Sequence, residues 1–177
     1  RCLIMPYDPH VHHRRSIRLP KYDYSQPGAY FITICVQNHV CLFGNITTTP
    51  NGAELELNEQ GKMVHNVWNE LPAKSPGLVL DAYIVMPNHF HAIVILDACN
   101  QDYTFSLSEI VHRLKTLTTK RYADRVKKLG WPKFPGRLWQ RNYWERVIRN
   151  EKELHAVREY IHYNPAKWED DPLFIGR

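Results

Sequence analysis

Long apolar runs are absent from this sequence. No stretch approaches the roughly 20 consecutive apolar residues that a membrane-spanning helix needs. The first residues also lack the pattern of a secretory leader, in which a charged segment precedes an apolar stretch and a small-residue cleavage site. These absences argue against a membrane partner, and we expect a cytoplasmic, nucleoid-associated protein.

Cysteine is scarce. The four cysteines form no Cys-x-x-Cys pair and are too few for a disulfide scaffold; they are Cys2, Cys35, Cys41 and Cys99. We therefore expect reduced, structural thiols. Internal repeats and low-complexity tracts are absent as well, which excludes repeat architectures.

The size of the chain predicts one domain. Its 177 residues, of which 44% are hydrophobic, suffice for one buried core but not comfortably for two. We assign residues 29–168 to this domain, residues 1–28 to an N-terminal arm and residues 169–177 to a tail. The chain opens at Arg1, and we expect Met5 to be the natural start. Lys and Arg number 23 against 18 Asp and Glu, so the net charge of +5 favours an anionic partner.

The arm is predicted to be extended. Residues 6–28 contain four prolines, which interrupt regular structure. They also contain a basic cluster that consists of Arg14, Arg15, Arg18 and Lys21.

The domain alternates strand and helix patterns. Aromatic and β-branched residues predict strands over 29–37, 41–46, 53–57, 78–86, 89–96 and 138–148. Helical spacing of apolar residues predicts helices that follow Asn58, cover 106–129 and run from Asn150 to about Tyr163. This order is typical of an α+β ferredoxin-like sandwich, in which helices pack on a central antiparallel sheet.

A His-x-His pair begins one of these strands. In a strand, alternate side chains share a face, so His89 and His91 can converge on one metal ion while Phe90 points away. The pattern alone is weak, because the arm contains His10-Val11-His12 where no strand would align the rings. Two ordinary histidines at a strand end remain an alternative at this point.

A second group of polar residues ends the last helix. Tyr160 and Asn164 are four residues apart and therefore share a helical face. An apolar stripe that would dock this helix on the sheet consists of Leu154, Val157 and Ile161. Taken alone, this pattern more often marks an amphipathic rim residue, here Tyr160, and a polar helix end before a proline, here Asn164.

Three ordered motifs resemble a known family, the REP-associated tyrosine transposases, which are single-tyrosine HUH transposases. The motifs are Met86-Pro87-Asn88-His89-Phe90-His91, the block from Trp139 to Asn150, and Tyr160-Ile161-His162-Tyr163-Asn164-Pro165. The resemblance extends from about Tyr22 to Trp168. It implies that His89 and His91 bind a metal ion and that Tyr160 is the nucleophile. Asn164 matches the third ligand, for which related transposases often carry glutamine.

The resemblance also implies the reaction. Tyr160 would attack a DNA phosphate and form a 5′-phosphotyrosine intermediate, from which a 3′-hydroxyl could rejoin the strands. Tyr163 competes for this role, but it lacks the four-residue spacing to Asn164. The family favours Mg²⁺ or Mn²⁺, although ligand chemistry alone leaves Zn²⁺ open.

Single-stranded or hairpin DNA with REP-like palindromes is the implied partner, and a homodimer is one arrangement that the resemblance allows. Phosphate contacts are predicted for the basic residues of the arm and of the 106–129 helix, namely Arg14, Arg15, Arg18, Lys21, Lys115 and Lys120. We interpret Trp139, Tyr143 and Trp144 as core or strand-packing residues rather than base platforms.

Two other functions remain open. A ferredoxin-like sheet could bind nucleic acid without cutting it. A zinc hydrolase or nucleobase deaminase could use the same histidines, but the expected His-x-Glu and Cys-x-x-Cys partners are missing.

Overall fold

The computed structural model describes residues 22–50, 52–97 and 105–174. In this part of the chain, a four-stranded antiparallel sheet has the spatial order β4 (Leu78–Val85), β5 (His89–Leu96), β1 (Gly28–Cys35) and β6 (Trp144–Ile148). Together with two helices, the strands follow the connectivity β-α-β-β-α-β. The predicted ferredoxin-like sandwich is therefore confirmed.

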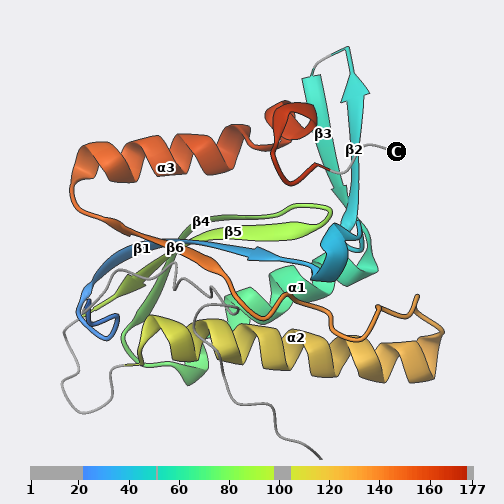
Figure 1. The fold of residues 1–177 in the computed structure, drawn as a ribbon, viewed down its shortest axis with the longest axis horizontal. Coiled ribbons are helices and arrows are strands. Elements are labelled where there is room, and N and C mark those ends of the chain that lie inside the picture. The colour runs from blue at the N-terminus through green and yellow to red at the C-terminus, as the bar shows by residue number, and fades with distance from the viewer. Residues whose placement is uncertain (1–21, 51, 98–104, 175–177) are drawn as a thin grey trace, which may run out of the picture.

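Helices cover both faces of the sheet. α1 (Glu59–Glu70) and α2 (Leu107–Leu129) lie on one face, and α3 (Glu151–Tyr163) lies on the other (Figure 1). Asn58, Ser106 and Asn150 cap the three N-termini through side-chain oxygens that accept backbone N–H groups. Gly130 ends α2 in the left-handed conformation, at φ 68°. None of the helices in the described ranges has the length and apolar character of a membrane span.

The two faces of the sheet carry different cores. The larger core packs under α1 and α2 and includes Tyr30, Ile32 and Ile34 of β1, all fully buried. The smaller core lies under α3 and consists of Ile93, Ile148, Val157 and Ile161. The predicted apolar stripe of the last helix thus docks it on the sheet. The smaller core leaves room on this face for polar side chains.

β2 (Gly44–Thr49) and β3 (Gly52–Leu57) form a separate two-stranded hairpin. Its first strand starts later than the predicted 41–46 range. Leu42 and Phe43 are buried, and the backbone N–H groups of both donate to the carbonyl of Pro87. These two residues therefore anchor the hairpin beside the start of β5 instead of extending it.

The predicted strand over 138–148 is wrong in its first half. Only residues 144–148 form a strand, β6, although Trp139 makes an isolated bridge to Val36 and Gln140 N–H donates to the carbonyl of Cys35. Between these pairings, the Lys115 ammonium of α2 binds the carbonyls of residues 140–142, at 2.9–3.2 Å. The Lys115 ammonium thus binds carbonyls that, in a continuous strand, would accept hydrogen bonds from a neighbouring strand.

Candidate metal and nucleophile site

His89 and His91 lie on the face of β5 that α3 covers. Both rings are buried, and their centroids are 4.4 Å apart. The alternation of the strand places them together, as predicted, while Phe90 enters the opposite core. Two imidazole nitrogens can therefore approach a common point.

Asn88 determines which ring nitrogen of His89 carries the proton. The amide nitrogen of Asn88 donates to the carbonyls of His39 and Leu173, at 3.2 and 2.7 Å. Its oxygen therefore faces His89 Nδ1, 2.8 Å away, and accepts a hydrogen bond from the protonated Nδ1. Nε2 of His89 keeps a free lone pair as a result. A partner of this kind is how proteins usually orient a metal-binding histidine.

Thr33 supports His91 from the neighbouring strand. The two residues are paired in register, and Thr33 Oγ1 lies 2.8 Å from His91 Nδ1. This contact leaves His91 Nε2 to face the last helix, where the Tyr160 hydroxyl is 3.4 Å away.

Burial keeps both imidazoles neutral. Loss of solvent lowers the pKa of His89 to about 4, although the negative charge of Asp171 opposes the shift. Burial, followed by the neighbouring His89, also lowers the pKa of His91 well below its ordinary value. Neutral imidazoles are the form that binds metal ions.

Asp171 joins this site, although no motif in the sequence predicted it. Its side chain is 4% exposed, and Oδ2 lies 4.0 Å from His89 Nε2. One ligand atom each from His89, His91 and Asp171 lie within 4.8 Å of one another, so the three could hold a metal ion. The 3₁₀ turn η3 (Pro165–Asp170) carries the chain from the end of α3 back over the histidines. In the predicted tail, Asp171 follows Glu169 and Asp170, and no spacing or motif distinguishes it from these two acidic neighbours.

Asn164 is buried at the end of α3, 2% exposed. Its amide nitrogen lies 3.5 Å from Asp171 Oδ2, at the limit of a hydrogen bond. Among the described residues, neither Asn164 Oδ1 nor His89 Nε2 has a hydrogen-bond partner. Buried polar atoms rarely stay unpaired in native proteins, so these two fit a site completed by an ion.

Tyr160 borders the histidines on the solvent side. The residue is 43% exposed, and its ring packs edge-on against His91 and Phe31, with centroids 5.3 and 5.8 Å away. Burial and then the charge of Asp171 raise its pKa, so the phenol is protonated at neutral pH. The competitor Tyr163 is 56% exposed and packs beside His162 instead.

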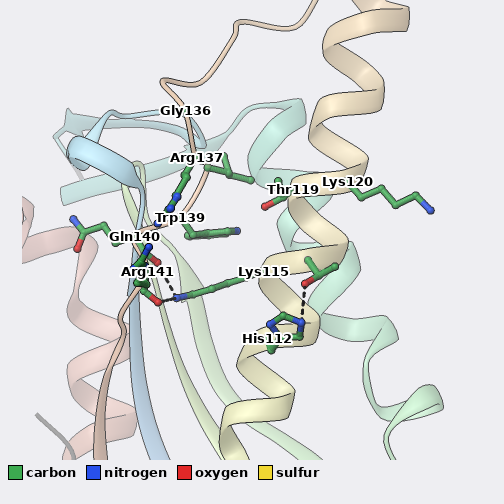
Figure 2. Close-up of a pocket in the computed structure, with 11 residues that line it drawn as sticks. His112, Lys115, Thr119, Lys120, Gly136, Arg137, Trp139, Gln140 and Arg141 are labelled. Atoms are coloured by element: carbon green, nitrogen blue, oxygen red, sulfur yellow. Dashed lines mark hydrogen bonds between the residues drawn. The ribbon is translucent and has the colours of Figure 1, made fainter. Parts of the chain in front are cut away.

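The predicted DNA contacts divide into two groups. Arg14, Arg15, Arg18 and Lys21 lie outside the described residues. Lys115 and Lys120 line a cavity of about 610 Å³ between α2 and residues 136–141. Figure 2 shows the Lys115 side chain reaching towards that segment and the Lys120 side chain extending away from it. The roles of all six residues in DNA binding stay predictions.

The three aromatic residues of the 139–144 block differ in exposure. Trp139 and Tyr143 are 4% and 9% exposed, which agrees with their interpretation as core residues. Trp144 is 59% exposed, so its interpretation as a packing residue is wrong. Its position on the edge strand β6 leaves its side chain open to solvent.

Comparison with known proteins supports the resemblance. The family model described as transposase IS200-like matches residues 57–164. An uncharacterized protein of Haemophilus influenzae is 35% identical over 179 residues, which cover 96% of this chain and 97% of that protein. A candidate REP-associated tyrosine transposase of the same organism is 25% identical over 148 residues, which cover 82% of this chain and 74% of that protein.

A solved structure has a similar fold. The structure of a REP-associated tyrosine transposase bound to a REP hairpin superposes with a TM-score of 0.57 and 22% identity. The match covers 85% of this chain and 73% of that one.

Proposed function

Because the chain belongs to the IS200-like transposases, whose members cleave DNA and transfer strands, we propose that it cuts and rejoins single-stranded or hairpin DNA through Tyr160. The observation that carries this proposal is the position of the Tyr160 hydroxyl, 3.4 Å from His91 Nε2. A nucleophile must lie next to the group that holds the phosphate. Tyr160 meets this condition, whereas Tyr163 packs beside His162.

The metal site of the proposal consists of His89 Nε2, His91 Nε2 and Asn164 Oδ1, with Asp171 as an additional oxygen ligand. Two unpaired buried atoms, on His89 and Asn164, support this assignment. A mixed set of imidazole and oxygen ligands suits Mn²⁺, and the oxygens suit Mg²⁺. When bound, the cation would neutralise the scissile phosphate and polarise its oxygens.

Tyr160 supplies the nucleophile of the proposed reaction. The Tyr160 oxygen forms a bond to phosphorus, and its proton passes through solvent to the leaving 3′-oxygen. The bond to the 3′-oxygen breaks, and that oxygen takes up a proton, which leaves a 5′-phosphotyrosine and a free 3′-hydroxyl. Attack by a 3′-hydroxyl on the phosphotyrosine reverses these changes and joins strands without ATP.

The DNA partner is inferred from chemistry and likeness. The chain is basic, with a net charge of +5, and the similar solved structure is that of a protein bound to a REP hairpin. We propose REP-like palindromes as the substrate. The basic residues of the arm and Lys120 are the proposed phosphate contacts, and Lys115 contributes through the segment that it holds.

Covalent capture tests the proposed function. The protein is incubated with Mn²⁺ and hairpin DNA that has a REP-like palindrome as its stem and carries single-stranded extensions. We expect a protein–DNA adduct that survives a denaturing gel, with the nucleotide on the peptide that contains Tyr160. The adduct should disappear with EDTA. Binding without any adduct would instead support a nucleic-acid-binding module.

A further inference from the structure

An exposed tryptophan lies in line with the candidate site. Strand register pairs His91 with Thr33 and Thr33 with Trp144, so the three residues form one row across β5, β1 and β6. Paired residues in an antiparallel sheet project from the same face, which here is the face that α3 covers. Two strand spacings place Trp144 about 10 Å from His91.

A cavity connects Trp144 to the nucleophile. It has a volume of about 450 Å³, and its lining includes Phe31, Trp144, Arg146, Val157 and Tyr160. Phe31 forms a fixed wall because it stacks on His91, with centroids 5.3 Å apart, and meets the Tyr160 ring edge-on. Tyr160 thus borders both this cavity and the histidines. A molecule bound here would lie directly beside the reacting phenol.

We propose that this cavity binds the base of a nucleotide next to the phosphate that Tyr160 attacks, and that the base stacks on Trp144. The inference rests on the proposed function. Exposed aromatic rings beside a strand path are typical platforms for single-stranded DNA, since every base has a π-face. At 59% exposure, the Trp144 indole leaves much of its surface available for stacking.

The charge at the rim fits a nucleotide. The Arg146 side chain is 65% exposed, and its ion pair with Glu153 is long, at 3.7 Å. Such an exposed pair contributes little to stability, so the guanidinium can turn to a DNA phosphate at small cost. Glu145 also borders the cavity, but it pairs in register with Ile32 of the opposite core, so its side chain projects to the other face of the sheet. A largely apolar cavity with a cation at its edge matches a flat base attached to an anionic backbone. A purely apolar partner would not use that cation.

The test uses hairpin DNA in which 2-aminopurine replaces each base on either side of the cleaved bond in turn. Stacking on an indole quenches the fluorescence of this base. We expect one position at which the wild-type protein quenches it and Trp144→Ala does not, while Trp144→Phe quenches partly. Tyr163→Ala is the matched control, because it removes an exposed ring of α3 that does not line the cavity. This control should quench like the wild type.

Affinity gives a second readout. Trp144→Ala should weaken binding of the intact DNA about tenfold, as loss of one stacked base does. An abasic site at the quenched position should weaken wild-type binding by a similar factor and leave Trp144→Ala binding unchanged. Thermal melting checks that each variant is folded.

Several results would overturn the inference. Equal quenching by the wild type and Trp144→Ala would do so. The inference would also fail if Trp144→Ala and the abasic site weakened DNA binding additively. A wild-type dimer that Trp144→Ala converts to monomers in sedimentation would assign the cavity to a second copy of the chain. Failure of the proposed function can be told apart from failure of this inference. If the function is wrong, the wild-type protein forms no covalent adduct, whether or not it quenches 2-aminopurine.

Discussion

The Tyr160 hydroxyl and His91 Nε2 come within 3.4 Å of each other, although the two residues are 69 positions apart in the sequence. The docking of α3 produces this contact, since Val157 and Ile161 pack on the sheet beside Ile93. His91 lies two residues before Ile93 on the same face of β5, and Tyr160 lies next to Ile161. The apolar contacts of one helix thus place the phenol at the histidine pair.

Replacement of Tyr160 by Phe tests the nucleophile. The ring is kept, so its packing on Phe31 and His91 should keep folding and DNA binding close to wild type. The covalent adduct with hairpin DNA should be lost on denaturing gels. Tyr163→Phe should retain it. An adduct that persists in Tyr160→Phe and vanishes in Tyr163→Phe would identify Tyr163 as the nucleophile.

Asn88 should control metal affinity without binding the metal. Asn88→Ala removes the acceptor that holds the proton on His89 Nδ1. Loss of such an orienting partner typically weakens metal binding by about 10- to 100-fold. Titration calorimetry with Mn²⁺ measures the effect, and His89→Ala gives the reference for loss of a ligand. Unchanged affinity in Asn88→Ala would show that His89 is oriented by other contacts.

Asp171 and Asn164 can be compared as oxygen ligands. Asp171→Asn keeps the shape of the side chain but removes its charge, so we expect Mn²⁺ affinity to fall about tenfold or more if the carboxylate binds the ion. Asn164→Ala should lower it as well, because it removes the unpaired Oδ1. Normal affinity in Asp171→Asn alone would leave Asn164 as the third ligand and assign Asp171 a supporting role.

The ion pair of Arg158 with Asp81 should hold α3 in place. Arg158 donates to both carboxylate oxygens of Asp81 on β4, at 2.8 and 2.6 Å, and this contact lowers the pKa of Asp81. Asp81→Asn should destabilise the protein by about 1 kcal/mol, as expected for a well-aligned pair near the surface. Urea unfolding measures this loss.

The same pair predicts a dependence on pH. A carboxyl group with a lowered pKa stabilises the fold above its unfolded value of 3.8, and this contribution is lost as the pH falls through the lower folded value. The difference between wild type and Asp81→Asn should therefore shrink below pH 3.8.

Glu70→Gln is the control for the position of α3, because it breaks the Arg121 pair between α1 and α2 instead. It should destabilise the protein but not slow adduct formation, whereas Asp81→Asn should do both.

Lys115 and Lys120 should act differently despite lining one cavity. Lys120→Glu should weaken hairpin binding and lower its salt dependence by about one unit of slope, with melting unchanged. Lys115→Met should instead lower the melting temperature, because three carbonyls lose their donor. A melting temperature that does not change in Lys115→Met would contradict its structural role.

The sequence determined the features that depend on local signals. Capping residues such as Asn58 and Ser106 set the helix starts, because their side chains satisfy N–H groups only three residues away. The alternation of β5 placed His89 and His91 on one face, because the period of a strand is fixed. The likeness of three motifs then identified the family.

Tertiary structure decided the features that depend on distant contacts. Asp171 reaches the histidines because η3 turns the chain back over them, and no local pattern encodes that turn. The strand predicted from residue 138 is interrupted because Lys115, on another element, binds its carbonyls. Trp144 is exposed because it lies on the edge strand β6 outside the core that packs under α3, whereas Ile148, on the same face of that strand, is buried in this core. Burial depends on the neighbours that a residue acquires in the fold, and a single sequence does not specify those neighbours.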